Sequence, residues 1–254
     1  MKKTYVYIIS LAAFFIVLPS QGQESPAPPD SVVVPLKIYA GAELAGPVIY
    51  FTDRSTLNFE AYLCGDINEK MSAYLSGGWS DYKYTQYNYD FLLKGSFLRA
   101  GVDFNLLRPE KAEGKYWAGT GIRYGLSRFT SETPELWHEN YWGRVTSSLP
   151  ERKDWGHFLE VSGGFRAELF RSFNIGWTVS VRKLIYTGAP KDTRPVFIPG
   201  YGETGKSFAF GINYYISFSI PYKKIKVQIK PEPVEEPEEG SEAGTQNQTV
   251  VPGR

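Results

Sequence analysis

The sequence predicts an all-β fold, an eight-stranded antiparallel transmembrane β-barrel with a disordered C-terminal tail. Three observations support this. Eight segments alternate apolar and polar residues with period two, an export signal precedes them, and the connections between them alternate in length. Phe208–Phe218 is the clearest segment, with large apolar residues on one face and small or polar residues on the other. In lipid every backbone polar group needs a partner, and closure of the sheet provides it.

Residues 1–22 are predicted to be a secretory signal peptide. Lys2 and Lys3 precede an apolar run from Tyr5 to Leu18, and the small residues up to Gly22 form a cleavage site. An uncleaved membrane anchor is the alternative, but the run is shorter than the roughly 20 residues that span a bilayer. The signal predicts export, and with the strands it predicts the cell outer membrane.

Composition agrees with an exported barrel. The chain has 18 Tyr, 16 Phe and 25 Gly, which suit interfacial aromatic girdles and a narrow interior. The formal net charge of +1 gives no electrostatic case for nucleic acid binding. Cys64 is the single cysteine, so no disulfide can form within the chain.

After a flexible lead-in at residues 23–34, the barrel is predicted over residues 35–222. Its strands are, in order, Pro35–Leu44, Thr56–Leu63, Lys70–Trp79, Gly95–Phe104, Tyr116–Leu126, His157–Leu169, Ile175–Tyr186 and Phe208–Phe218. Each has an apolar face, and Lys183 is the main charge on those faces, near a strand end where it can reach the interface. The fifth strand places Gly119, Gly121 and Gly125 on the inward face, as a narrow lumen requires.

The connections alternate between long and short, as expected when both chain ends are periplasmic. The longer ones are Ala45–Ser55, Asp81–Leu93, Arg128–Gly156 and Thr187–Lys206, and the shorter ones are Cys64–Glu69, Asn105–Gly114 and Phe170–Asn174. A soluble β-sandwich or lipocalin-like barrel also alternates with period two, but it would expose charge where these strands have apolar residues.

Four segments carry a family resemblance. They are Arg123–Ser127, Leu159–Val161 continuing to Ala167–Phe170, Ile198–Tyr201, and Phe210–Tyr214 with Ile220–Lys224. Together they resemble an uncharacterised family of small Bacteroidota outer-membrane β-barrels, over about residues 35 to 224. The resemblance implies the fold and the location, and it supplies no catalytic motif.

The predicted register turns ten charged side chains inward. They are Lys37, Arg99, Arg123, Arg166 and Arg182 with Glu43, Glu60, Asp103, Glu160 and Glu168. Because an eight-stranded barrel is just wide enough for side chains to fill it, these charges are expected to pair and to block a water path. The alternative is a narrow ion channel, although a selective pore would favour one sign of charge.

The sequence offers little for catalysis or for a metal. His138 lies in the longest connection, and His157 and Glu160 point to opposite faces of a strand. A triad or a zinc site would need these groups to converge, so no enzyme activity and no cofactor are predicted. A lipid-modifying enzyme remains an alternative function.

Aromatic residues in the long connections are candidates for binding, because such rings bury large areas at low entropy cost. The candidates are Tyr84, Tyr87, Trp137, Tyr141, Trp142 and Tyr201. The acidic, Pro-rich segment 223–254 is predicted to be a disordered periplasmic tail, either a spacer or a docking segment. The leading hypothesis is a structural or accessory barrel that contacts outer-membrane lipid, presents extracellular loops and joins an envelope protein complex.

Overall fold

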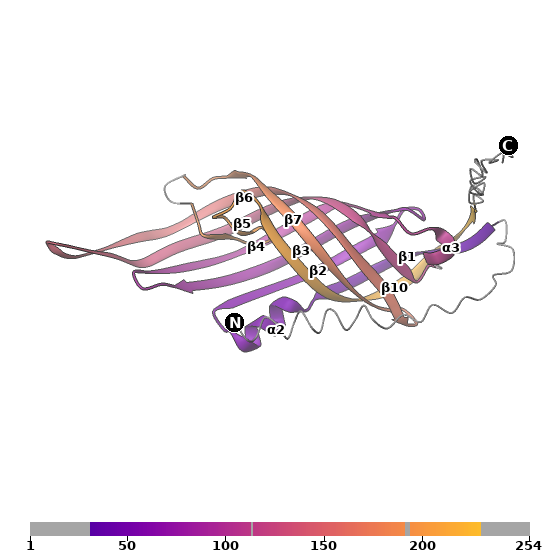
Figure 1. Cartoon of the computed structure of the whole chain (residues 1–254), viewed down its shortest axis with the longest axis horizontal. Helices are drawn as coiled ribbons and strands as arrows, with labels where there is room; N and C mark the ends of the chain where they lie inside the picture. Colours follow the sequence, from indigo (N-terminus) through magenta and orange to yellow (C-terminus); the bar gives the residue numbers. More distant parts are fainter. Residues whose placement is uncertain (1–30, 113, 191–193, 230–254) are drawn as a thin grey trace, which may run out of the picture.

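The computed structural model describes residues 31–112, 114–190 and 194–229. Its sheet is a closed barrel in the order β1-β10-β7-β6-β5-β4-β3-β2, with antiparallel pairing throughout (Figure 1). The predicted eight-stranded antiparallel β-barrel is therefore confirmed. No helix in these ranges is long and apolar enough to cross a membrane.

The eight barrel strands are longer than predicted. They are β1 (Ser31–Glu43), β2 (Thr56–Asp66), β3 (Met71–Thr85), β4 (Tyr89–Asn105), β5 (Tyr116–Asn140), β6 (Gly143–Phe170), β7 (Phe173–Thr187) and β10 (Ala209–Gln228). The remaining elements are α2 (Ala45–Thr52), α3 (Pro109–Ala112), β8 (Phe197–Ile198) and β9 (Gly202–Glu203). We call the end where β1 begins and β10 ends the terminal end, and the opposite end the loop end.

Two predicted loops are mostly strand. The β3–β4 hairpin pairs as far as Thr85 and Asp90, and the β5–β6 hairpin pairs as far as Asn140 and Gly143. Each of these strands was predicted to end near the length that spans a bilayer, whereas the backbone pairing continues beyond that length. The β5–β6 hairpin consequently projects well past the barrel rim (Figure 1).

The predicted residue bounds of the barrel were too narrow. At the terminal end Ser31 pairs with Gln228, so residues 31–34 of the predicted lead-in and 223–228 of the predicted tail belong to strands. The predicted signal peptide, the rest of the lead-in and residues 230–254 of the tail lie outside the described residues.

The predicted register holds through the barrel. Ile122 and Val161 are each 53% exposed on the outward face, whereas their neighbours Arg123 and Glu160 are buried inside. Leu36 was predicted to face outward and is instead 3% exposed, because a β-bulge between Leu36 and Lys37 shifts the alternation there.

A hydrophobic cluster closes the lumen at the loop end. Its buried members are Phe91, Leu93, Phe129, Phe158, Ile198, Tyr201 and Ala209. The connection between β7 and β10 contributes Ile198 and Tyr201, so it folds back over the mouth of the barrel rather than extending from it. Gly200 makes this possible: its φ is 74°, and a Cβ there would lie 2.6 Å from the Phe97 ring.

If the outward face contacts lipid, the substitution Ile122→Arg should lower the free energy of unfolding by about 2–4 kcal/mol. The measurement is urea unfolding of protein refolded into lipid vesicles. Val145→Arg is the matched control, because Val145 is also an exposed apolar side chain but lies on the projecting hairpin. Equal losses in the two variants would show that the outward face of the barrel is not in lipid.

Candidate functional site

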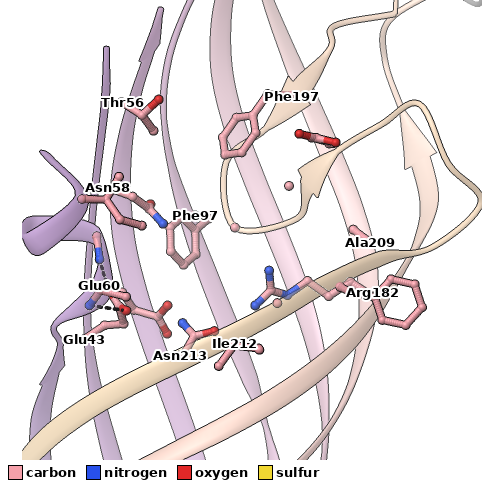
Figure 2. Close-up of a pocket in the computed structure, with 18 of the residues that line it drawn as sticks. Glu43, Thr56, Asn58, Glu60, Phe97, Arg182, Phe197, Ala209, Ile212 and Asn213 are labelled. Carbon is pink, nitrogen blue, oxygen red and sulfur yellow. Dashed lines mark hydrogen bonds between the residues drawn. The ribbon is translucent and has the colours of Figure 1, made fainter. Parts of the chain in front are cut away.

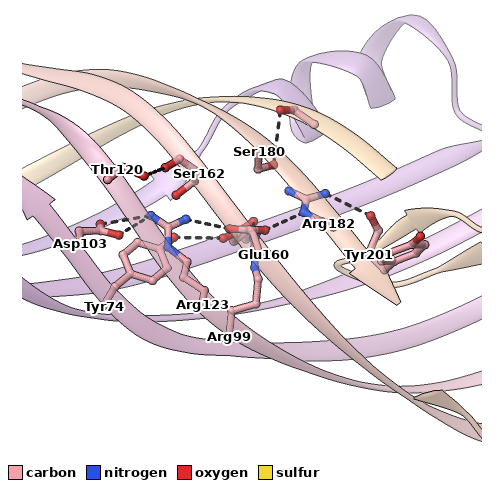
Figure 3. Close-up of polar contacts among 12 residues, drawn as sticks. Tyr74, Arg99, Asp103, Thr120, Arg123, Glu160, Ser162, Ser180, Arg182 and Tyr201 are labelled. Atoms are coloured by element: carbon pink, nitrogen blue, oxygen red, sulfur yellow. Dashed lines mark hydrogen bonds and ion pairs between the residues drawn. The ribbon is translucent and has the colours of Figure 1, made fainter. Parts of the chain in front are cut away.

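Glu160 lies at the centre of the lumen and contacts three arginines (Figure 3). Its carboxylate accepts hydrogen bonds from Arg99 at 2.5 Å, from Arg123 at 3.0 Å and from Arg182 at 2.6 Å. Register explains two of these contacts, since Glu160 is directly opposite Arg123 on β5 and Arg182 on β7. The carboxylate is fully buried, so it depends on these partners for all its solvation.

Two further carboxylates balance the cluster. Glu60 forms an ion pair with Arg99, and Asp103 accepts from Arg123 at 3.0 Å. The Arg123 guanidinium also lies 3.6 Å from the centroid of the Tyr74 ring. Three arginines thus meet three carboxylates, and the predicted pairing of these six residues is confirmed.

The other four inward charges are placed differently. Lys37 pairs with Glu168 at the terminal end, as expected for opposed charges, and donates to the carbonyl of Gly114 at 2.7 Å. Glu43 instead accepts from the backbone N–H groups of Ala45 and Gly46, at 2.7 and 2.8 Å.

Arg166 was predicted to neutralise a carboxylate, and this is wrong for the part of the chain described. No ion pair there includes Arg166, although its side chain is buried. Its guanidinium lies 3.6 Å from the centroid of the Tyr39 ring and 5.6 Å from that of Trp117. A cation over an aromatic face is stabilised by the ring quadrupole, and strand alternation alone does not reveal such a partner.

The cluster leaves little free space at its level of the lumen. A void of only about 10 Å³ lies among Glu60, Tyr74, Arg123 and Glu160, room for one water molecule at most. Gly121 is required here, because a Cβ on it would lie 2.1 Å from Asp103 Oδ1. The arrangement closes the lumen at this level.

The aromatic candidates fall into two groups. Tyr141 and Trp142 form the tip of the β5–β6 hairpin, are 93% and 89% exposed, and contact each other edge to face. Lower on the hairpin Trp137 packs between the exposed Tyr87, at 4.7 Å between centroids, and the Arg144 guanidinium, at 3.9 Å. These four side chains are available to a partner.

The remaining two candidates contribute to packing. Tyr84 is half-buried and stacks on Tyr82, against the cluster at the loop end. Tyr201 is 1% exposed and packs on Phe158, so its selection as a binding residue is wrong. The sequence placed it in an exposed loop, whereas the connection folds into the mouth of the barrel.

A groove that the sequence did not predict lies at the base of the hairpin. Its volume is about 400 Å³, and it is lined by Tyr89, Phe91, Leu136, Leu149, Arg152 and Val196 among others. It forms because the ladder between β5 and β6 is irregular between Ser131 and Leu136. Bulges of this kind leave no clear signal in a single sequence.

The histidines do not converge with a nucleophile. His157 is on the outward side of β6, where Nδ1 is 2.7 Å from the Tyr124 hydroxyl oxygen, and His138 is exposed on the hairpin. In the described ranges no group of three or more His, Cys, Asp or Glu side chains could hold a metal ion.

A family model described as a domain of unknown function, DUF6048, matches residues 4–225. The chain belongs to this family. A comparison with curated protein sequences finds no match. This match does not show a Bacteroidota origin, which stays a prediction.

Solved structures of small outer-membrane β-barrels are similar in fold to this DUF6048 member. Ail of Yersinia pestis has 9% identity and a TM-score of 0.35, over 74% of this chain and 98% of Ail. Neisserial surface protein A has 12% identity and a TM-score of 0.33, over 76% and 99%. The N-terminal barrel of Pseudomonas aeruginosa OprF has 12% identity and a TM-score of 0.25, over 75% and 98%.

The substitution Glu160→Gln should destabilise the barrel by about 3–5 kcal/mol, because three buried arginines would lose a shared anion. The control Glu139→Gln removes a carboxylate from the exposed hairpin and should change stability little. Adding Arg182→Gln to Glu160→Gln should recover part of the loss by restoring the charge balance. Urea unfolding measures all three, and an unchanged midpoint for Glu160→Gln would contradict the central role of this carboxylate.

Proposed function

We propose that this DUF6048 member is an outer-membrane β-barrel that presents its β5–β6 hairpin to a binding partner, as a structural or accessory component of the cell envelope. The observation that carries the proposal is the hairpin itself. β6 pairs with β7 only from Gly156 onward, so the segment before it, with the opposing end of β5, extends beyond the closed barrel. Its tip places two large aromatic side chains in solvent.

The location is supported by the outward face. Exposed apolar residues cover it on every side of the barrel, and a contiguous apolar surface of that extent needs a covering phase. Examples on five strands are Leu63, Leu98, Ile122, Val161 and Ile212. Lipid is the phase that a closed sheet with paired backbone groups is suited to meet.

The form of the hairpin fits recognition. Backbone pairing from Trp137 with Thr146 to Asn140 with Gly143 holds the tip in a defined shape. A preorganised tip loses less entropy on binding than a flexible loop does. Exposed Tyr and Trp are the residues that most often dominate binding energy at interfaces.

The two other functions considered have less support. A channel needs a continuous path, and the charge cluster around Glu160 blocks the lumen at its own level, with the hydrophobic cluster beyond it at the loop end. An enzyme needs its reactive groups close together and aligned, and neither His138 nor His157 is near a candidate nucleophile with an orienting acid. We therefore propose a role that is not enzymatic.

Purified protein in planar lipid bilayers should show no steady conductance of porin size. The reason is the cluster of three arginines and three carboxylates, whose charges leave no excess of either sign to attract one kind of ion. A variant with Arg123→Ala and Asp103→Ala, which removes a pair and its volume, provides the comparison. Robust current through the unmodified protein would contradict the closed lumen.

The orientation and the binding role are tested at the same two positions. Cys64 is buried, so Trp142→Cys and Lys70→Cys each introduce an accessible thiol, one at the hairpin tip and one at the terminal end. A maleimide that cannot cross membranes should label the tip variant in intact cells and the Lys70 variant only after the outer membrane is permeabilised. The reverse result would place the hairpin in the periplasm.

A photoreactive amino acid at position 142 should then form discrete crosslinked products in cells, and the same amino acid at position 70 should not. Tyr141→Ala, combined with the probe at 142, should reduce their yield without changing the heat-modifiable migration of the folded barrel. Products formed at position 70 alone would place the recognition surface at the terminal end.

A further inference from the structure

The barrel wall is incomplete beside β1 at the loop end. The last pair between β1 and β10 is Glu43 with Tyr215, and β1 and β2 pair only from Ile38–Gly65 to Ala42–Ala61. β10 nevertheless continues to Ala209, where it pairs with β7, and β2 continues to Thr56, where it pairs with β3. Within the described ranges, 209–213 of β10 and 56–60 of β2 therefore face each other without a strand between them. We call this opening the lateral slot.

Helix α2 partly covers the slot. The chain leaves β1 at Glu43, whose carboxylate accepts from the N–H groups of Ala45 and Gly46 and so turns the helix against the wall. Gly46 packs directly on β2, since a Cβ there would lie 2.0 Å from the carbonyl oxygen of Asn58. The outer side of α2 presents Val48 and Phe51 to the surroundings.

A cavity of about 460 Å³ lies behind the slot (Figure 2). Its lining includes Glu60, Arg99 and Arg182 from the lumen, and also Phe210 and Ile212, which are exposed on the outward face. A cavity lined by residues from both the inner and the outer face of the barrel wall opens through that wall. The volume is within the range of about 300–1,000 Å³ that is typical of ligand pockets.

The mouth of the cavity is continuous with the apolar outer surface. Phe210 is opposite Val181 on β7, which is opposite Val161 on β6 and then Ile122 on β5. These outward side chains form one row across the sheet, and the row ends at the slot. A ligand that enters there must have an apolar part.

The inner end of the cavity is polar and favours an acceptor. Its lining has three carboxylates: Glu43, which accepts from backbone N–H groups, Glu60, which is paired with Arg99, and Glu203, which is exposed. Arg182 donates from Nε to Glu160 and from Nη1 to the carbonyl oxygen of Tyr201, and no hydrogen bond among the described residues uses its Nη2. Lys206 adds a cation at the solvent side of the lining.

From this arrangement we infer that the slot admits a single-chain anionic amphiphile of the fatty-acid class. Its carboxylate lies toward Arg182 and Lys206, and its chain lies along Phe210, Ile212 and Ile49. The inference rests on the membrane location proposed above, because the chain must be supplied from the bilayer.

The test uses the full barrel in phosphatidylcholine vesicles and a palmitic acid analogue with a photoreactive diazirine in its chain. Crosslinks located by mass spectrometry should saturate with probe concentration at Ile49, Phe210 and Ile212. Labelling at Ile122 and Val161 should not saturate, because these positions meet ordinary surrounding lipid. Absence of labelling at Ile122 and Val161 would refute the membrane location itself, separately from the site.

Two variants test the site. Ala209→Phe adds a ring to the cavity lining and should weaken saturable labelling by about tenfold. Ala100→Phe adds the same ring to the outward face of β4 and should leave it unchanged. If Ala209→Phe fails to give a heat-modifiable barrel, Lys206→Glu at the exposed rim serves instead, and it should weaken labelling by the acid.

The head group is tested with the matching palmityl alcohol and with a diazirine phosphatidylcholine. Preference for the acid over both supports the assignment. Equal labelling by the alcohol, or stronger labelling by the phospholipid, would overturn it, as would labelling that neither saturates nor responds to Ala209→Phe and Lys206→Glu.

Discussion

A single buried carboxylate organises the interior of this barrel. Glu160 is shared by arginines from β4, β5 and β7, and two of these arginines use a second carboxylate as well. Taking one ion out of water costs several kcal/mol, so none of these side chains tolerates the lumen without the others. The cluster therefore joins β2, β4, β5, β6 and β7 in one polar unit, which adds side-chain contacts to the backbone ladder in fixing their relative register.

Most of the barrel could be predicted from the sequence because its constraint is simple. Where one face of a strand must be apolar, a register shift of one residue would move every apolar side chain to the opposite face. The alternation of apolar and polar residues is therefore a strong signal. Arg123, Glu160 and Arg182 could be placed in the lumen for this reason, and their direct contact follows from register. Leu36 could not be placed correctly, because a bulge inserts a residue without changing the composition of the strand.

The parts that escaped prediction have a different physical origin. The hairpin beyond the rim is held by backbone pairing in water, which does not require an apolar face, so its sequence resembles a loop. Tyr201 and Arg166 depend on partners far away in the sequence, a hydrophobic cluster for the first and aromatic rings for the second. The lateral slot follows from where β1 ends relative to β2 and β10, a property of three strands together.

The position of that slot has a consequence for assembly. Seven of the eight contacts around the barrel join strands that follow one another along the chain, whereas β1 and β10 join residues as distant as Ser31 and Gln228. Closing so long a loop is entropically costly and slow, so the hairpins form first and this seam forms last. The slot adjoins this seam where β10 extends beyond the end of β1. Pairing of β1 with β10 therefore closes the barrel but leaves the wall open at the loop end.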